Sequence, residues 1–160
     1  MKYNSFELDI FKKSLSIATK TLGKQKSAEI IYNDENPTFN GNFISLKEPP
    51  KKITKSNISS IRGEADSIAS QIRYHNPKIH NKFMLHDNDS SKIFNALEKS
   101  RCETLGSNDL IGVKKNIRVN HENKLENFLK KNKNFNEINI ENIFHILGFI
   151  HFSNQKIDNK

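Results

Sequence analysis

A chain of 160 residues with 34% hydrophobic residues and a mean hydropathy of −0.72 suffices for one domain with a modest core. The net charge is +8, with 22 Lys, 4 Arg and 22 Asn. Because AT-rich codons encode Lys and Asn, this composition can reflect codon usage, and the charge alone does not indicate a nucleic-acid binder. Residues 61–110, the most distinctive part, hold 7 basic and 7 acidic residues, whereas a phosphate-binding surface would concentrate positive charge there.

The sequence predicts a cytoplasmic protein without a membrane partner. The N-terminal residues alternate charged and apolar groups and lack the apolar core of a signal peptide. The most apolar segment, residues 143–152, is about half as long as a bilayer-spanning helix. The single cysteine, Cys102, excludes an intrachain disulfide and favours a reducing compartment.

The first 50 residues predict one helix followed by a small β-hairpin. Apolar residues at helical spacing begin at Phe6, and Gly23 can end that helix. Residues 27–33 and 41–46 are rich in β-branched and aromatic residues and are separated by a turn-rich stretch, which predicts that they pair as the two strands of a hairpin. Pro49 and Pro50 then interrupt regular structure.

The second predicted helix has the clearest pattern. Thr54 can cap its first amides, and Asn76, which precedes Pro77, should end it. Its apolar stripe keeps a spacing of three and four over four turns and consists of Ile58, Ile61, Ala65, Ile68, Ala69 and Ile72.

Four further helices are predicted. A short one starts near Pro77, a longer one runs from Ser90 to Leu105 and is stopped by Gly106, and a third follows residues 107–108. The last covers residues 140–152. The predicted fold is therefore mainly α, a helical domain with a small N-terminal β-hairpin. The predicted divisions are 1–47 (helix plus hairpin), 48–56 (Pro/Lys linker), 57–153 (helical region) and 154–160 (flexible tail).

Three histidines, His75, His80 and His86, are the first candidates for metal ligands. Their spacings of five and six do not place them on one helical face, and no Cys or carboxylate lies at ligand spacing. His75 instead extends the apolar stripe into the last turn, where an imidazole can satisfy free carbonyl groups. We expect structural histidines and no metal site; a metal chaperone using these three residues is the alternative.

The charged residues favour packing over catalysis. Arg62 and Asp66 are four residues apart, and Glu98 and Arg101 are three apart, which are spacings for ion pairs on one helix face. Acid–base catalysis would need a cleft and shifted pKa values in addition. The segment 87–91 departs from the Asp-x-Ser-x-Ser metal motif at its third position and is better explained as a helix cap. No phosphate loop or activated nucleophile is recognisable, so we expect no catalytic residue.

Taken together, three segments resemble the N-terminal region of CobT, a subunit of the aerobic, ATP-dependent cobaltochelatase. A Pro-Pro linker precedes an Arg-Gly-x-Ala-Asp helix and a His-x4-His turn, followed by Glu-x2-Arg-x-Glu-x2-Gly and Gly-Val-x2-Asn. The order and spacing hold over about residues 45–125, and the resemblance is loose over 1–44 and weak over 126–160. The signature residues, which are also the interface candidates, are Arg62, Gly63, Asp66, His75, His80, Glu98, Arg101, Glu103 and Gly106.

The resemblance implies a role within an assembly. In this family a large CobN-type subunit binds the corrinoid, a CobS-type AAA+ subunit hydrolyses ATP, and the complex inserts cobalt(II) into hydrogenobyrinic acid a,c-diamide during cobalamin biosynthesis. ATP, Mg and cobalt(II) are thus expected for the complex and no cofactor for this chain. Family members continue into an acidic linker and a von Willebrand A-type domain, so this chain is expected to be a fragment or a shortened homologue.

The predicted function is accordingly that of a non-catalytic subunit that acts by docking on the AAA+ partner. Residues 143–152 are the main candidate for the docking surface, although an ordinary core helix explains them equally well. The alternative is a basic helical nucleic-acid binder or a generic protein-interaction module. Nucleic-acid binding is disfavoured because no reader motif is present and aromatic residues do not interleave the basic runs.

Overall fold

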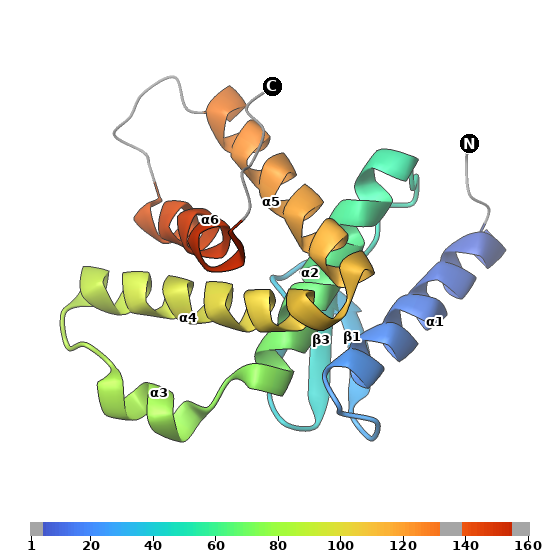
Figure 1. Cartoon of the computed structure of the whole chain (residues 1–160). Helices are drawn as coiled ribbons and strands as arrows, with labels where there is room; N and C mark the ends of the chain where they lie inside the picture. The colour runs from blue at the N-terminus through green and yellow to red at the C-terminus, as the bar shows by residue number, and fades with distance from the viewer. Residues whose placement is uncertain (1–4, 132–138, 155–160) are drawn as a thin grey trace.

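The computed structural model describes residues 5–131 and 139–154, which form a mainly α fold with one small sheet (Figure 1). This confirms the predicted fold class. The elements in chain order are α1 (Ser5–Leu22), β1 (Glu29–Asn33), β2 (Thr38–Phe39), β3 (Phe43–Lys47), α2 (Lys55–Tyr74), α3 (Pro77–Phe83), α4 (Asn88–Asp109), α5 (Ile111–Lys131) and α6 (Ile140–Ser153).

The predicted pairing of the strands is wrong. Residues 29–33 and 43–47 do form strands, but β1 and β3 are parallel, with Glu29 opposite Phe43. The short strand β2 pairs antiparallel with β3 and makes the hairpin, so the sheet order is β1-β3-β2. Gly41, with a φ of +92°, supplies the left-handed turn between β2 and β3. Because the chain reverses between β1 and β2 and again between β2 and β3, β3 runs in the same direction as β1.

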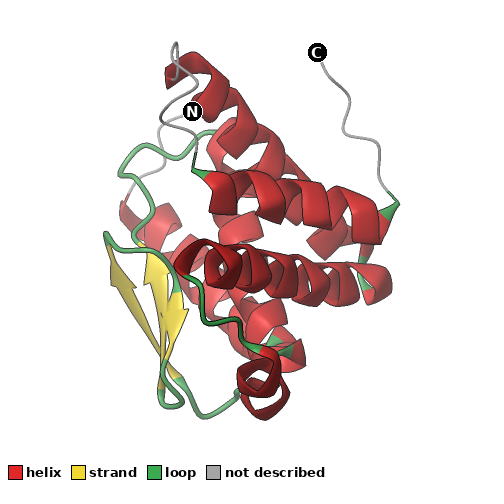
Figure 2. Cartoon of the chain, turned by 90° about the vertical axis from the view of Figure 1, so that its left-hand side faces the viewer, coloured by secondary structure: helices red, strands yellow, loops and turns green. Residues whose placement is uncertain are grey.

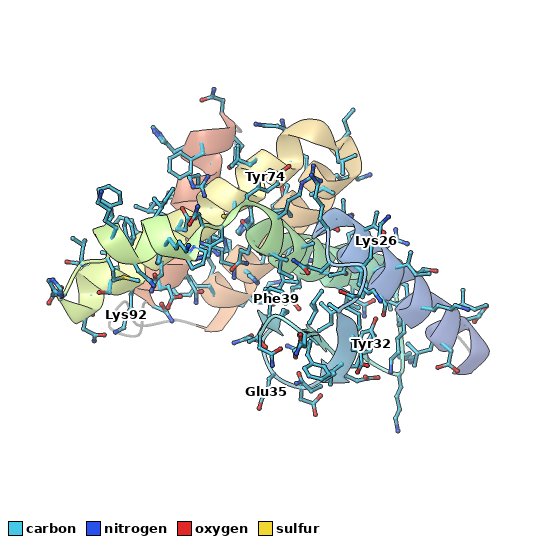
Figure 3. The ribbon with its side chains drawn as sticks, turned by 90° about the horizontal axis from the view of Figure 1, so that it is seen from below. Lys26, Tyr32, Glu35, Phe39, Tyr74 and Lys92 are labelled. Atoms are coloured by element: carbon cyan, nitrogen blue, oxygen red, sulfur yellow. The ribbon has the colours of Figure 1, made fainter. Side chains whose placement is uncertain are left out.

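The sheet and α1 pack together on one side of α2. Tyr32 of β1 lies beside α1, where its hydroxyl donates to the Lys12 carbonyl at 2.8 Å (Figure 3). Figure 2 shows the sheet on one flank of the helices. A shared core joins α1, the sheet and α2, so the predicted division at residues 48–56 does not separate two cores. The buried residues of this shared core are Leu15, Ala28, Ile44, Leu46, Ala65 and Ile68.

Helix α2 is buried on more than its apolar stripe. Every residue from 65 to 70 is buried, including Asp66, Ser67 and Ser70. The side of α2 away from the sheet packs against α4 and α5, and small residues let these helices approach closely. The stripe recognised in the sequence therefore marks only one of two buried faces.

Most predicted helix ends are confirmed by their caps. The Thr54 side chain accepts from the Asn57 amide, and α2 ends at Tyr74 with His75 as its C-cap. Asp87 caps α4 by accepting from the Ser90 amide at 3.0 Å, as expected for segment 87–91. Two boundaries are wrong: α4 continues through Gly106 to Asp109, and α5 therefore begins at Ile111 and not directly after residues 107–108. A β-carbon at residue 106 would collide with the Ser70 hydroxyl, so Gly106 allows α4 to cross α2 and does not stop the helix.

Helix α6, which contains the apolar segment 143–152, is a core helix on one face. Its buried residues are His145, Ile146, Gly148 and Phe149, and it packs on α4. Its other face exposes Leu147 and Phe152. Among the described helices, none combines the length and apolar character that crossing a bilayer requires. From residue 155 onward, the predicted tail lies outside the part of the chain that the structure describes.

The crossing of α2 and α5 gives a first prediction. A methyl group on Gly63 would lie 2.6 Å from the Asn120 β-carbon and would collide with the backbone carbonyl of Asn116. Backbone cannot move aside cheaply, so we expect Gly63→Ala to lower the free energy of unfolding by about 3 kcal/mol, measured by urea denaturation.

Gly112→Ala is the matched control, because a β-carbon there meets no atom within 4 Å. We expect its stability to be unchanged or slightly higher, since alanine favours helix over glycine. Equal behaviour of the two variants would contradict the close α2–α5 crossing.

Candidate functional site

The centre of the helical region is one carboxylate, Glu103 of α4, that joins four helices. Its Oε2 atom accepts from Nε2 of His121 on α5 at 2.8 Å and from Nε2 of His145 on α6 at 2.9 Å. Its Oε1 atom accepts from the hydroxyl of Ser67 on α2. Helix α4 packs on α2, α5 and α6 (Figure 1). We call Glu103, His121 and His145 the Glu103 cluster.

The Glu103 cluster is almost closed to solvent. The side chains of Glu103 and His121 are each 1% exposed, and that of His145 is 8% exposed. Burial opposes ionisation of Glu103, but His145 and His121 outweigh it and hold its pKa well below the usual value. Burial lowers the pKa of His145, against the opposing effect of Glu103. Glu103 is therefore a buried carboxylate that depends on two imidazoles.

A second cluster lies about one helical turn away on α4. Arg101 donates to both oxygens of Glu98, at 2.7 and 2.8 Å, and also to the Tyr74 carbonyl at 3.0 Å. The Nδ1 atom of His75 is 3.0 Å from Glu98 Oε1. Arg101 is the main cause that lowers the pKa of Glu98 to about 2, and burial raises the pKa of Cys102 to about 12. This network ties the end of α2 to α4.

The histidines of the predicted turn do not form one site. The ring of His80 lies edge-on to that of His75, with ring centroids 4.8 Å apart, and its Nε2 contacts Asn95 Oδ1 at 2.8 Å. His86 is exposed. The groups of donors in the described part of the chain that could share a metal ion contain His75 but neither His80 nor His86. The metal-chaperone alternative on these three residues thus lacks a common centre.

The other signature residues line contacts between helices. Asp66 accepts from the Asn116 side chain of α5 at 2.8 Å, and Gly63 faces the same helix. Burial raises the pKa of Asp66 to about 6, partly offset by Asn116 and then by Arg62. The guanidinium of Arg62 lies 5.9 Å from the Phe11 ring centre. The predicted pairing of Arg62 with Asp66 is thus only a longer-range attraction.

Sequence reasoning missed two of the three residues of the Glu103 cluster. Neither His121, His145 nor Ser67 was among the candidates, and Asn116 entered only as the last residue of the Gly-Val-x2-Asn motif. Two signals were available: His121 follows the buried Ile117 by four residues, and His145 precedes the buried Phe149 by four. A histidine on the buried face of an apolar helix requires a polar partner inside the protein.

A groove of about 1060 Å³ runs beside the Glu103 cluster. Ser67 and His145 form part of its wall, Lys99 and Lys124 add positive charge, and the apolar lining comes mainly from α5 and α6. Within the described residues no serine or cysteine side chain is hydrogen-bonded to a histidine ring, so the arrangement lacks the nucleophile–base pair of covalent catalysis.

The fold and its clusters define a helical domain in which polar side chains link the helices. A family model described as "Cobalamin biosynthesis protein CobT" matches residues 6–146, and the chain therefore belongs to the CobT family, a cobaltochelatase subunit of cobalamin biosynthesis. The match extends further at both ends than the region around 45–125 in which the motifs were recognised. No solved structure matches the chain.

The raised pKa of Asp66 predicts a specific pH dependence. The pKa of Asp66 rises from 3.8 to about 6 on folding, so the folded state binds the proton more tightly than the unfolded state. This difference in proton affinity stabilises the folded state below pH 4. The stabilisation is lost as the pH rises through 6. The loss is at most about 3 kcal/mol. We expect Asp66→Asn to remove this slope and to be more stable than the wild type at pH 7, measured by urea denaturation from pH 4 to 7.

Asp89→Asn is the control for that comparison, because Asp89 is an exposed aspartate on α4. It should keep the wild-type profile. A wild-type profile in Asp66→Asn would show that Asp66 does not titrate in this range.

Proposed function

We propose that this chain is a non-catalytic subunit of a cytoplasmic cobaltochelatase that docks on a CobS-type AAA+ ATPase and works with a CobN-type corrinoid-binding subunit. The assembled complex would use ATP and Mg to insert cobalt(II) into hydrogenobyrinic acid a,c-diamide. The family match over residues 6–146 is the observation that carries this proposal.

The arrangement of polar side chains supports a binding role. Glu98, Glu103 and Asp66 are each held by side chains of the same domain. Groups bound in this way fix the mutual positions of helices, and a rigid scaffold can transmit the motion of a motor partner. Catalysis would then take place elsewhere in the assembly.

We assign the docking surface to α3. This helix has no buried residue, and it lies apart from the helical bundle below α4 (Figure 1). Ile79 and Phe83 are each 58% exposed, and Leu85, just after the helix, is 48% exposed. We call these three residues the α3 face. His80 of the same helix contacts the α4 side chains Phe94 and Asn95, which fixes the orientation of α3.

The charge around the α3 face indicates the chemistry of the partner surface. Lys78 and Lys82 lie on the same helix and are exposed. An apolar patch with a basic rim fits a partner surface with an apolar centre and acidic edges. We propose that the AAA+ subunit carries such a surface.

Association with the AAA+ subunit tests this function. We expect the wild-type chain to co-purify with that subunit in the presence of ATP and Mg. The double variant Ile79→Ser, Phe83→Ser should bind at least about 10-fold more weakly, because exposed apolar anchors dominate such interfaces. Its melting temperature should be unchanged, since neither side chain is buried.

The control is Ile17→Ser on α1, since Ile17 is also 58% exposed. It should bind the AAA+ subunit like the wild type. Absence of association of the wild-type chain would contradict the proposed function, and equal weakening by Ile17→Ser would contradict only the assignment to α3.

A further inference from the structure

We propose that Glu103, His121 and His145 hold a divalent transition-metal ion of the zinc type. This site is distinct from the His75, His80 and His86 set considered from the sequence, and it is independent of the docking role. It would be a resident metal centre within the helical domain.

The donor atoms of the Glu103 cluster have the arrangement that such an ion needs. Nε2 of His121 and Nε2 of His145 both point to Glu103 Oε2, at 2.8 and 2.9 Å, and all three atoms lie within 4.8 Å of one another. Two imidazoles and one carboxylate are a common protein donor set for Zn²⁺. At bond lengths of about 2.0–2.1 Å, two ligands of a tetrahedral ion are only a few tenths of an ångström further apart than each ring nitrogen is from Glu103 Oε2.

The charge of the cluster favours a cation. If both rings are neutral, each donates its Nε2 hydrogen to Glu103, and one negative charge stays in a site that is 1% exposed. Lys99 and Lys124 line the neighbouring groove, but neither forms an ion pair with Glu103 among the described residues. A divalent ion would occupy the place of the two Nε2 hydrogens, with each neutral ring carrying its hydrogen on Nδ1 instead, and would compensate the carboxylate directly.

A His121 ring with a hydrogen on both nitrogen atoms would compensate the charge of Glu103 less well than that ion. The Nδ1 atom of His121 is buried and has no hydrogen-bond partner in the described structure. An imidazolium would place a charged N–H group at this position without an acceptor. With metal on Nε2 the neutral ring carries its hydrogen on Nδ1, and an uncharged N–H group without an acceptor costs less there than a charged one.

The shell around the donors supports metal binding on one carboxylate oxygen. The Ser67 hydroxyl donates to Glu103 Oε1, which orients the carboxylate and leaves Oε2 to face the two rings. The Ser100 hydroxyl donates to the backbone carbonyl of His145 at 2.7 Å and holds that turn of α6 on α4. Three protein donors leave the fourth position of a tetrahedral ion to a water molecule, and the adjoining groove wall includes His145.

The neighbouring donor group, His75, Glu98 and Cys102, lacks these properties although its atoms are equally close. Both oxygens of Glu98 are occupied by the Arg101 guanidinium, which already compensates its charge. Burial raises the pKa of Cys102 to about 12, so its sulfur is a protonated thiol and a weak ligand. This group is a filled ion-pair network and provides a control within the same chain.

Titration with Co²⁺ as a spectroscopic probe tests the site. The full chain, without a histidine tag and stripped with chelator, should bind one equivalent of Co²⁺ with the visible absorption of a four-coordinate ion. One equivalent of Zn²⁺ should displace it and raise the melting temperature. We expect His145→Gln and Glu103→Gln to weaken Co²⁺ binding by more than about 100-fold.

His75→Gln is the matched control and should bind Co²⁺ like the wild type. Circular dichroism checks that each variant is folded, and the wild-type titration stands even if a variant of the cluster does not fold. Absence of stoichiometric Co²⁺ or Zn²⁺ binding by the wild type would overturn the proposal, as would loss of binding in His75→Gln with retention in His145→Gln.

Discussion

The buried carboxylate of Glu103 is the constraint around which the helical region is built. A carboxylate at 1% exposure is strongly unfavourable unless its oxygens are satisfied, and no single neighbouring helix supplies all the donors. Ser67 comes from α2, His121 from α5 and His145 from α6. These helices must therefore keep a fixed arrangement around α4, because a shift of any one of them would leave a charged or polar group unpaired inside the protein.

Small residues on α2 and α4 make that arrangement geometrically possible. Gly63 lets α5 approach α2, and Gly106 of α4 makes room for the Ser70 hydroxyl. The side chains Asp66 and Asn116 then hydrogen-bond across the α2–α5 contact. The residues on which the resemblance to CobT was based thus act largely as contacts between helices, and this role accounts for the conspicuous set of charged residues.

A rigid interior and an outlying helix suit a subunit that transmits motion. The interior is held by the Glu103 cluster and by the Glu98–Arg101–His75 network, whereas α3 projects an apolar face to solvent. A metal ion in the Glu103 cluster would strengthen the interior further, because it would join α4, α5 and α6 through coordination bonds. The proposed docking through α3 and the proposed metal binding in the interior use different residues and can be tested separately.

Elements whose signals are local could be predicted from the order of the residues. Apolar spacing and caps placed α1, α2, α3 and α6 nearly at their observed bounds, since a cap such as Thr54 bonds to residues only three positions away. The order and spacing of the motifs were also sufficient to indicate the CobT family. These features depend on neighbours along the chain, where spacing translates directly into geometry.

The way in which those elements meet depends on contacts between residues that are distant along the chain. The parallel pairing of β1 with β3 depended on the two-residue strand β2, which is too short to stand out in the sequence. Gly106 reads as a helix stop, yet it lies inside α4 because Ser70 of another helix needs the space. The Glu103 cluster joins residues 18 and 42 positions away from Glu103, and no spacing rule links such distant donors. Their meeting follows from the requirement that a buried charge find partners, and only the packed helices can meet it.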